Sequence, residues 1–205
     1  MKLLVIILTG LQSLLATLEQ KTLQSDFTLT IANNPSPIAN SQLPITYSGS
    51  LAMHGKQFAL SMFNMEAAYD GNTLYMYSED IEEITLTTPS EEELTQTNPF
   101  LYAQALLPVC QYAEKVIGDK TQITLTPASN SQSPLANSQP PIANNQSPIA
   151  KFILRVTTAT LLPVSAEIHE TEGNITTLRL TNPHYTDTAP AFVIEKEGVY
   201  VNDLR

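Results

Sequence analysis

Short segments in which apolar and polar residues alternate recur along this chain, and they constrain the fold more than any other feature. In the segment D-F-T-L-T-I the side chains of Phe27, Leu29 and Ile31 share one face of an extended strand, because successive side chains point to opposite faces. The same alternation recurs in residues 47–53. This pattern predicts a mainly β-sheet protein in which each strand buries one face.

Turn signals separate these segments and set the order of the strands. His54-Gly55 predicts one turn, and Asp70-Gly71 is the strongest short-range signal for a β-hairpin. Ser78-Glu79-Asp80 predicts a further turn. We expect strands at residues 26–31, 47–53, 56–63, 73–77, 81–88, 122–126, 151–157, 164–169, 175–180 and 192–195.

Two short helices are predicted to interrupt the sheet. Ser90 and Glu93 form a capping box, in which the serine side chain bonds to the amide of the glutamate three residues later. Asn98 then caps a second helix, Pro99 takes its first position, and Pro108 ends it.

Two proline-rich tracts do not fit this scheme. Residues 126–150 repeat a seven-residue unit of the type S-P-I-A-N-S-Q with drift, and residues 36–45 carry the same unit. Proline in nearly every unit forbids a continuous helix or a central strand. We expect low-complexity insertions between strands, at residues 33–45 and 126–150, where added length costs little loop-closure entropy. A proline-rich docking tract is the alternative, but P-x-x-P spacing is absent.

The N-terminus is typical of a signal peptide. A short positive segment precedes an apolar run that is too short and too interrupted to span a bilayer, and Ala16 offers a small residue for cleavage. We therefore expect residues 1–16 to direct secretion and residues 17–205 to form one domain. The alternative is an amphipathic first helix whose apolar face consists of Leu11, Leu14, Leu15 and Leu18.

Charge and cysteine content exclude several classes of partner and site. The net charge is −10, with ten basic and twenty acidic residues, so a phosphate backbone is repelled and nucleic acid is a poor partner. Cys110 is the only cysteine, which excludes an internal disulfide and any cysteine-cluster metal site.

No pattern of catalytic residues is present in the sequence. His54, His169 and His184 are the only imidazoles, and none has the spacing of H-E-x-x-H or G-x-S-x-G. Asp70 already has a backbone role in its turn, and the acids at 91–93 fit helix capping and solvation. We predict a protein that is not an enzyme, with no catalytic residue, no metal and no cofactor.

Several motifs occur in an order that resembles a known family. Residues 69–100 combine an aromatic residue before Asp-Gly, T-x-aromatic and a second tyrosine, then a proline, E-E-L and N-P-aromatic. Upstream, residues 49–58 read G-x-L-x-M-x-G-x-x-F, and the chain ends in Asp-Leu-Arg. In this order the motifs resemble the outer-membrane lipoprotein carrier family (LolA-like), in the form found in Bacteroidetes.

Two features depart from that family. Tyr69 and Tyr75 stand where tryptophan is common in its members. The family also has a longer helix before the first strand, so here it is either reduced to residues 17–25 or formed by residues 9–25.

The resemblance implies an incomplete antiparallel β-barrel with a helical lid over an apolar concave face. The implied function is that of a monomeric periplasmic carrier that shields the acyl chains of lipoproteins and delivers them from the inner to the outer membrane. Its partners would be acylated lipoproteins, an inner-membrane lipoprotein-releasing transporter and an outer-membrane acceptor. An envelope sensor of lipid or protein on the same fold is the alternative, and a hydrolase is a weaker one, since catalytic groups can converge in space.

The candidate binding residues follow from the strand alternation and the predicted helices. For residues 73–77 two assignments remain open: Tyr75 and Tyr77 face inward, or Leu74 and Met76 do. An ordinary sandwich core is the other interpretation of the apolar strand faces. The predicted acyl-binding face comprises Phe27, Leu29, Leu51, Met53, Phe58, Leu60, Tyr75 and Tyr77, and the predicted lid comprises Leu94, Phe100, Leu101, Leu106 and Leu107.

Overall fold

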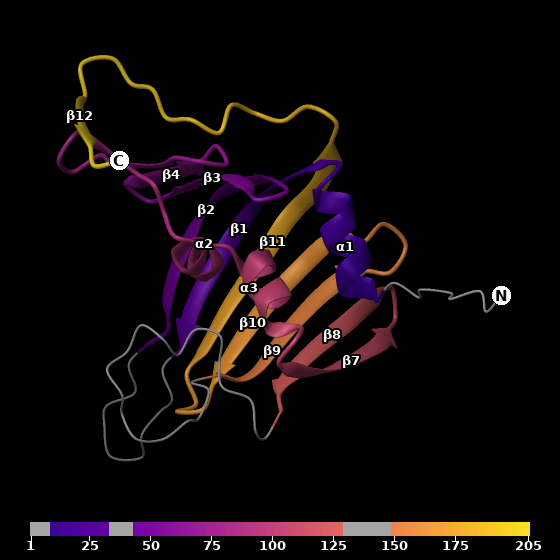
Figure 1. The fold of residues 1–205 in the computed structure, drawn as a ribbon. Helices are drawn as coiled ribbons and strands as arrows, with labels where there is room; N and C mark the ends of the chain where they lie inside the picture. Colours follow the sequence, from indigo (N-terminus) through magenta and orange to yellow (C-terminus); the bar gives the residue numbers. More distant parts are fainter. Residues whose placement is uncertain (1–8, 33–42, 129–148) are drawn as a thin grey trace.

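The computed structural model describes residues 9–32, 43–128 and 149–205. In these residues the chain forms one sheet of twelve strands and three short helices (Figure 1). The helices are α1 (Gly10–Leu18), α2 (Glu91–Thr97) and α3 (Pro99–Leu106). The strands are β1 (Thr22–Ala32), β2 (Ile45–His54), β3 (Gln57–Met62), β4 (Met65–Tyr69), β5 (Leu74–Ser78), β6 (Glu83–Thr87), β7 (Cys110–Ile117), β8 (Lys120–Pro127), β9 (Ile149–Thr157), β10 (Pro163–Glu170), β11 (Ile175–Thr186) and β12 (Tyr200–Asp203).

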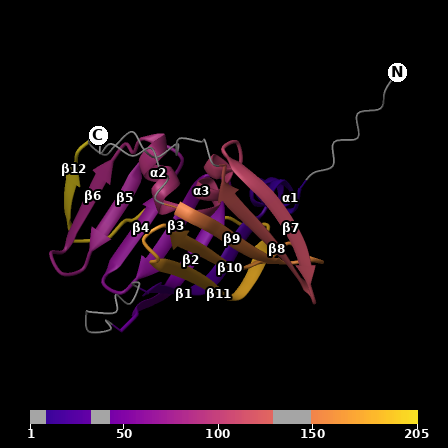
Figure 2. The same ribbon diagram turned by 90° about the horizontal axis from the view of Figure 1, so that it is seen from below.

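The sheet is open and almost entirely antiparallel. Its order is β12-β6-β5-β4-β3-β2-β1-β11-β10-β9-β8-β7, and only the β12–β6 pair is parallel among the described strands. The sheet curves, and α2 and α3 lie on its concave side (Figure 2). The fold is therefore mostly β with a few short helices, and the sheet is an incomplete barrel.

Helix α1 packs its leucines into the core. Thr9 caps it with a capping box to Gln12, and Leu11 and Leu14 have no exposed surface. This is the amphipathic first helix that the sequence offered as an alternative, and it lies within residues 9–25. Cleavage after Ala16 stays a prediction, and it would remove both leucines from the core.

Both short helices that were predicted to interrupt the sheet are confirmed. Ser90 and Glu93 form the expected reciprocal pair, in which the Glu93 amide donates to Ser90 Oγ at 3.3 Å and the Ser90 amide donates to the Glu93 carboxylate at 2.7 Å. Asn98 caps α3, and Pro99 is its first residue.

Most predicted strands are present, with three corrections. Strand β4 was not predicted, although the Asp70-Gly71 hairpin requires a strand on each side. Strand β7 was also missed, because it is an edge strand with mostly exposed side chains and weak alternation. The strand expected at residues 192–195 is wrong. That segment crosses the outer face of the sheet without pairing, and the last strand is β12.

The proline-rich tracts lie largely outside the described residues. Their ends are described, and they belong to the sheet rather than to the insertions. Thr126 and Pro127 complete β8, while Ile149 begins β9 and is buried. Among the described residues, no helix has the length and apolar character needed to cross a membrane.

Candidate functional site

A cavity of about 570 Å³ lies on the concave face of the sheet. The strands supply most of its wall, and the junction of α2 and α3 supplies Asn98 and Tyr102. Apolar side chains dominate the lining. The cavity is lined by Phe27, Leu29, Leu51, Met53, Phe58, Ala59, Leu60, Met62, Met65, Ala67, Leu74, Met76, Asn98, Tyr102, Ile149, Ala166, Ile168, Glu170, Thr176 and Leu178.

Strand register explains why these side chains share one face. Residues paired across neighbouring antiparallel strands point to the same side of the sheet. Leu51 pairs with Leu60, Leu60 with Ala67, and Ala67 with Met76. This row crosses four strands and forms the floor of the cavity.

Gly49 makes room for the ring of Phe27 in the cavity wall. A Cβ atom at this position would lie 2.0 Å from the carbonyl oxygen of Ser61 and 2.8 Å from Cζ of Phe27. No L side chain fits that space without moving the backbone of β3. The glycine therefore allows the Phe27 ring to lie across β2, where it contributes to the cavity wall.

Methionine is concentrated in the lining. The chain contains five methionines, and Met53, Met62, Met65 and Met76 line the cavity. Met65 is 46% exposed and Met76 is 39% exposed, which places them at the mouth. Unbranched, polarisable thioether side chains adapt to irregular apolar shapes, so this wall can adjust to its occupant.

Tyr102 is the aromatic residue that α3 contributes to the cavity. Its ring packs against Phe152 of β9, with ring centroids 6.1 Å apart. Burial, with smaller contributions from Cys110 and Glu170, raises the pKa of Tyr102 to about 12. The hydroxyl is therefore neutral at physiological pH and available as a hydrogen-bond donor.

Six of the eight residues predicted for the binding face line this cavity: Phe27, Leu29, Leu51, Met53, Phe58 and Leu60.

The prediction for β5 is wrong, because Leu74 and Met76 line the cavity and both tyrosines lie on the outer face. There Tyr75 donates to the carboxylate of Asp70 at 3.2 Å, and Lys196 lies 4.2 Å from the ring centre of Tyr77. Large side chains occur on both faces of this strand, Leu74 and Met76 on one and Tyr75 and Tyr77 on the other, so alternation cannot fix its parity.

The residues predicted for the lid pack into the core instead of lining the cavity. Leu94, Phe100 and Leu106 are buried in the main hydrophobic cluster, and Leu101 and Leu107 pack against it half-buried. The same segment reaches the cavity through Asn98 and Tyr102. Sequence reasoning identified Asn98 only as a helix cap.

Other lining residues were missed for different reasons. Leu178 pairs with Leu29 and with Ala166, and Ile168 lies on the same face. The alternation of apolar and polar residues in the strands predicted at residues 164–169 and 175–180 already indicated that these side chains share one face. Ile149 stands at the end of a proline-rich tract, where no periodic signal exists.

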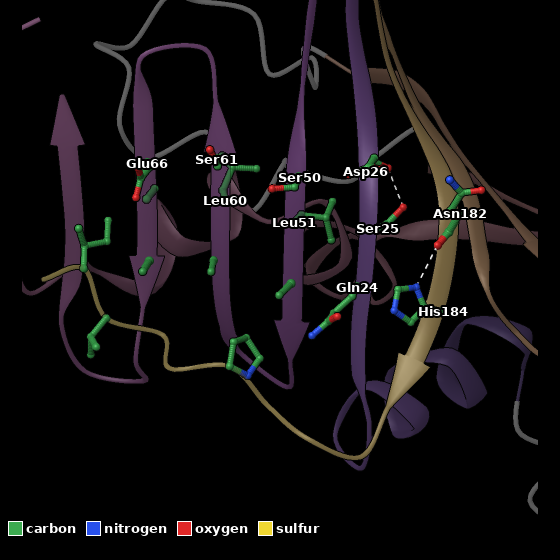
Figure 3. A pocket seen from close by; sticks show the side chains of 17 residues that line it. Gln24, Ser25, Asp26, Ser50, Leu51, Leu60, Ser61, Glu66, Asn182 and His184 are labelled. Atoms are coloured by element: carbon green, nitrogen blue, oxygen red, sulfur yellow. Dashed lines mark hydrogen bonds between the residues drawn. The ribbon is translucent and has the colours of Figure 1, made fainter. Parts of the chain in front are cut away.

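A second pocket, of about 430 Å³, lies on the outer face between β1–β4, β11 and the segment before β12 (Figure 3). Its wall carries small and polar side chains, including Gln24, Ser50 and Glu66. The His184 ring contacts the backbone of its own strand, β11, and its Nδ1 lies 3.0 Å from the carbonyl oxygen of Asn182. Because its wall is less apolar than that of the inner cavity, this pocket is a weaker candidate for an apolar ligand.

The candidate catalytic residues have structural partners. Asp70 accepts bonds from the amides of Asn72 and Thr73 at 2.8 and 2.7 Å, as expected for a turn. Burial acts to raise the pKa of Asp70, but these amides and the Tyr75 hydroxyl hold it below its ordinary value. Over the described part of the chain, no group of three or more metal-ligating side chains could hold a metal ion.

The other two imidazoles are also held by side chains outside the cavity. His54 Nδ1 lies 3.3 Å from Thr22 Oγ1, and His169 Nε2 lies 3.1 Å from a carboxylate oxygen of Glu167. The Thr22 hydroxyl beside His54 is buried, with Thr22 only 1% exposed, so it is not placed to attack a substrate.

Comparison with known proteins supports the fold. No family model matches the chain, and no curated protein is similar in sequence. An uncharacterized conserved protein from Thermus thermophilus is similar in structure, with a TM-score of 0.57 at 6% identity over 94% of this chain and 96% of that protein. This likeness shows a shared fold and nothing about function.

Two more distant structures are also similar over most of the chain. A LolA superfamily protein from Nitrosomonas europaea has a TM-score of 0.38 at 10% identity, over 89% of this chain and 96% of its own. MucB has a TM-score of 0.41 at 14% identity, over 93% of this chain and 64% of its own. Both likenesses are too distant to bear on the site.

Proposed function

We propose that the cavity holds an acyl chain and that the protein is a carrier that shields acylated lipoproteins in the periplasm, between the inner and the outer membrane. The observation that supports this most is the apolar cavity of about 570 Å³ on the concave face. Ligand sites for small molecules commonly measure about 300–1,000 Å³ and are mostly apolar.

The energetics of an acyl chain make such a cover necessary. Exposing a chain to water costs about 0.8 kcal/mol for each methylene, so about fifteen carbons cost roughly 12 kcal/mol. Burying the chain against Leu51, Leu60 and Leu74 removes most of that cost. A binding protein of this kind needs no catalytic residue.

Loading and release require a covering element that can move. Helices α2 and α3 are each short, and helices of this length depend on packing for their stability. In this proposal they form the lid, held by Phe100 and Leu106 in the empty protein and displaced when cargo enters. A small difference in free energy between the two states then decides between binding and release.

Partners at both membranes complete the proposal. The family resemblance suggests an inner-membrane lipoprotein-releasing transporter as the donor of cargo and an outer-membrane protein as its acceptor. The net charge of −10 disfavours direct adsorption to anionic lipid surfaces, which fits transfer through protein partners.

A matched pair of variants tests the acyl-chain site. Leu60→Asp places a charge in the cavity, whereas Ser61→Asp places the same charge one residue along β3 on the exposed outer face. Titration of the methyl ester of a fluorescent fatty acid and of an acylated peptide should give binding to the wild type and to Ser61→Asp. We expect Leu60→Asp to weaken binding by at least about tenfold, because an acyl chain cannot solvate a buried carboxylate.

Equal binding by the two variants would place the acyl chain elsewhere. If the wild type bound neither probe, the carrier proposal would fail, and an ordinary structural core would explain the apolar faces.

A further inference from the structure

The junction of α2 and α3 is built around one amide side chain. Asn98 ends α2, caps α3 and is 2% exposed. Its Oδ1 atom accepts hydrogen bonds from the backbone amides of Phe100 at 2.9 Å and Leu101 at 3.2 Å. These bonds fix the orientation of the amide, because the flipped group would set its NH₂ against two N–H donors.

The residue that carries this amide also lines the cavity. Asn98 lines the cavity, and its Nδ2 atom is buried without a hydrogen-bond partner among the described residues. Buried polar atoms in folded proteins nearly always have a partner. Capping alone does not explain an asparagine here, since Asp caps a helix equally well and has no donor to leave unpaired.

We propose that Nδ2 of Asn98 donates a hydrogen bond to a carbonyl oxygen of the bound ligand, and that it selects acyl esters and amides over plain hydrocarbon chains. This inference rests on the proposed acyl-chain site and names the chemical group recognised there. Tyr102 lies one turn further along α3 and lines the same cavity. The polar end of the ligand therefore lies beneath the start of α3, and its chain extends over Leu51, Leu60 and Leu74.

The charges around the cavity favour a neutral carbonyl over a carboxylate. Glu170 also lines the cavity, and its carboxylate accepts a bond from Asn174 at 2.8 Å. A fatty-acid anion would have to enter next to this group in a protein of net charge −10. No Lys or Arg stands among the described residues that line the cavity, so two like charges would disfavour such a complex, whereas an ester or amide carbonyl carries no charge.

Two competitors that differ by one oxygen atom test the inference. Methyl dodecanoate and methyl dodecyl ether have the same length, but only the ester has a carbonyl oxygen. Each is used to displace N-phenyl-1-naphthylamine from the full chain, and N-methyldodecanamide in a third arm distinguishes amide from ester cargo. The variants are Asn98→Ser and Asn98→Asp, which both keep a capping oxygen and lose the amide donor.

We expect the preference for ester over ether to fall by about five- to tenfold in both variants, which corresponds to one hydrogen bond. In Asn98→Ser, affinity for the ether should stay within about twofold of the wild type, and the amide should lose affinity as the ester does. In Asn98→Asp the added carboxylate weakens every competitor, so only the ratio of ester to ether affinity is compared. Thermal melting checks that each variant is folded. If Asn98→Ser does not fold, Asn98→Asp tests the inference in its place.

An unchanged ester-to-ether ratio with normal ether binding would overturn the role of Asn98 and leave the acyl-chain site intact. If the wild type bound none of the three competitors, the proposed function and this inference would fail together.

Discussion

The concave face of the sheet has a packed part and an open part made from similar residues. The packed part comprises Ile123, Leu125, Phe152, Leu154 and Val156, all at most 1% exposed. The open part comprises Leu29, Leu51, Leu60, Leu74 and Met76, which are half-buried or exposed.

One cross-strand row connects the two parts. Leu29 pairs with Leu178, Leu178 with Ala166, Ala166 with Leu154, and Leu154 with Ile123. The strands themselves do not differ in pairing along this row. The two parts differ in what lies over them. Helices α1 and α3 contact β8 in the packed part, whereas the open part lies against the cavity. The same alternating strands thus build a core where helices cover them and the wall of a cavity where helices do not.

Removal of α1 should have the largest effect, because it would open the packed part to water. A chain that starts at Thr17 lacks Leu11 and Leu14, which have no exposed surface. Each buried leucine is worth about 2–5 kcal/mol, so the loss is comparable with the whole stability of a domain. Urea unfolding should show a largely unfolded truncated chain, and a control chain that starts at Thr9 should remain folded.

Equal stability of the two chains would contradict a structural role for α1. It would favour the signal-peptide interpretation with cleavage after Ala16.

Matched truncations of one side chain in each part should separate stability from binding. Ile123→Ala should reduce the free energy of unfolding by about 2–5 kcal/mol, because it leaves a void in a close-packed region. Leu51→Ala should cost only about 1–2 kcal/mol, because its side chain already borders a cavity. Acyl-chain affinity should fall for Leu51→Ala and stay near the wild-type value for Ile123→Ala, as measured at a temperature where both are folded. Similar stability losses would mean that the open part is ordinary core.

Filling the cavity should turn the open part into a packed one. Ala67 lies in the row between Leu60 and Met76, so Ala67→Phe introduces a ring where room exists. We expect unfolding stability to change by less than about 1 kcal/mol, since new apolar burial offsets local strain. Acyl-probe binding should be lost. A melting temperature far below that of the wild type would show that the cavity does not exist in solution.

The smallest predicted effect on stability concerns an ion pair on the outer face of the sheet. Glu167 forms an ion pair with Arg155 and lies 3.1 Å from His169 Nε2. Burial acts to raise the pKa of Glu167, but the bonds from Arg155 and His169 hold it below its ordinary value. A depressed carboxyl pKa stabilises the fold above the ordinary value of about 4.3, and this contribution is lost as pH falls through the folded-state pKa.

Glu167→Gln should therefore flatten the decrease in the free energy of unfolding below about pH 5, by no more than about 1 kcal/mol, as followed by urea unfolding across the pH range. Acyl-probe affinity should be unchanged at neutral pH. An unaltered pH profile would show that this pair contributes nothing measurable to stability.

The sequence predicts the sheet better than it predicts the cavity. Alternation assigned Leu29, Leu51 and Leu60 to the inner face because those strands expose their other face to polar surroundings. It failed at Tyr75, because the chain before β12 covers the outer face of β5 and removes the contrast between the two sides.

Whether an inward-facing leucine lies in the core or lines a cavity depends on distant helices. Leu60 and Leu154 have similar local sequence patterns, but only Leu154 lies in the packed part. Asn98 shows the same limit, since its capping role is local and its unpaired Nδ2 is visible only with the cavity wall in place.

Photo-crosslinking of an acylated peptide, with a diazirine near the end of its acyl chain, tests the central claim most directly. Mass spectrometry of the crosslinked protein identifies the strand that the chain contacts. We predict crosslinks in β2 to β5, at Leu51, Leu60, Leu74 or Met76, with competition by unlabelled acylated peptide. Crosslinks confined to the outer face, at Ser61 or the chain before β12, would contradict the claim that the open part binds acyl chains.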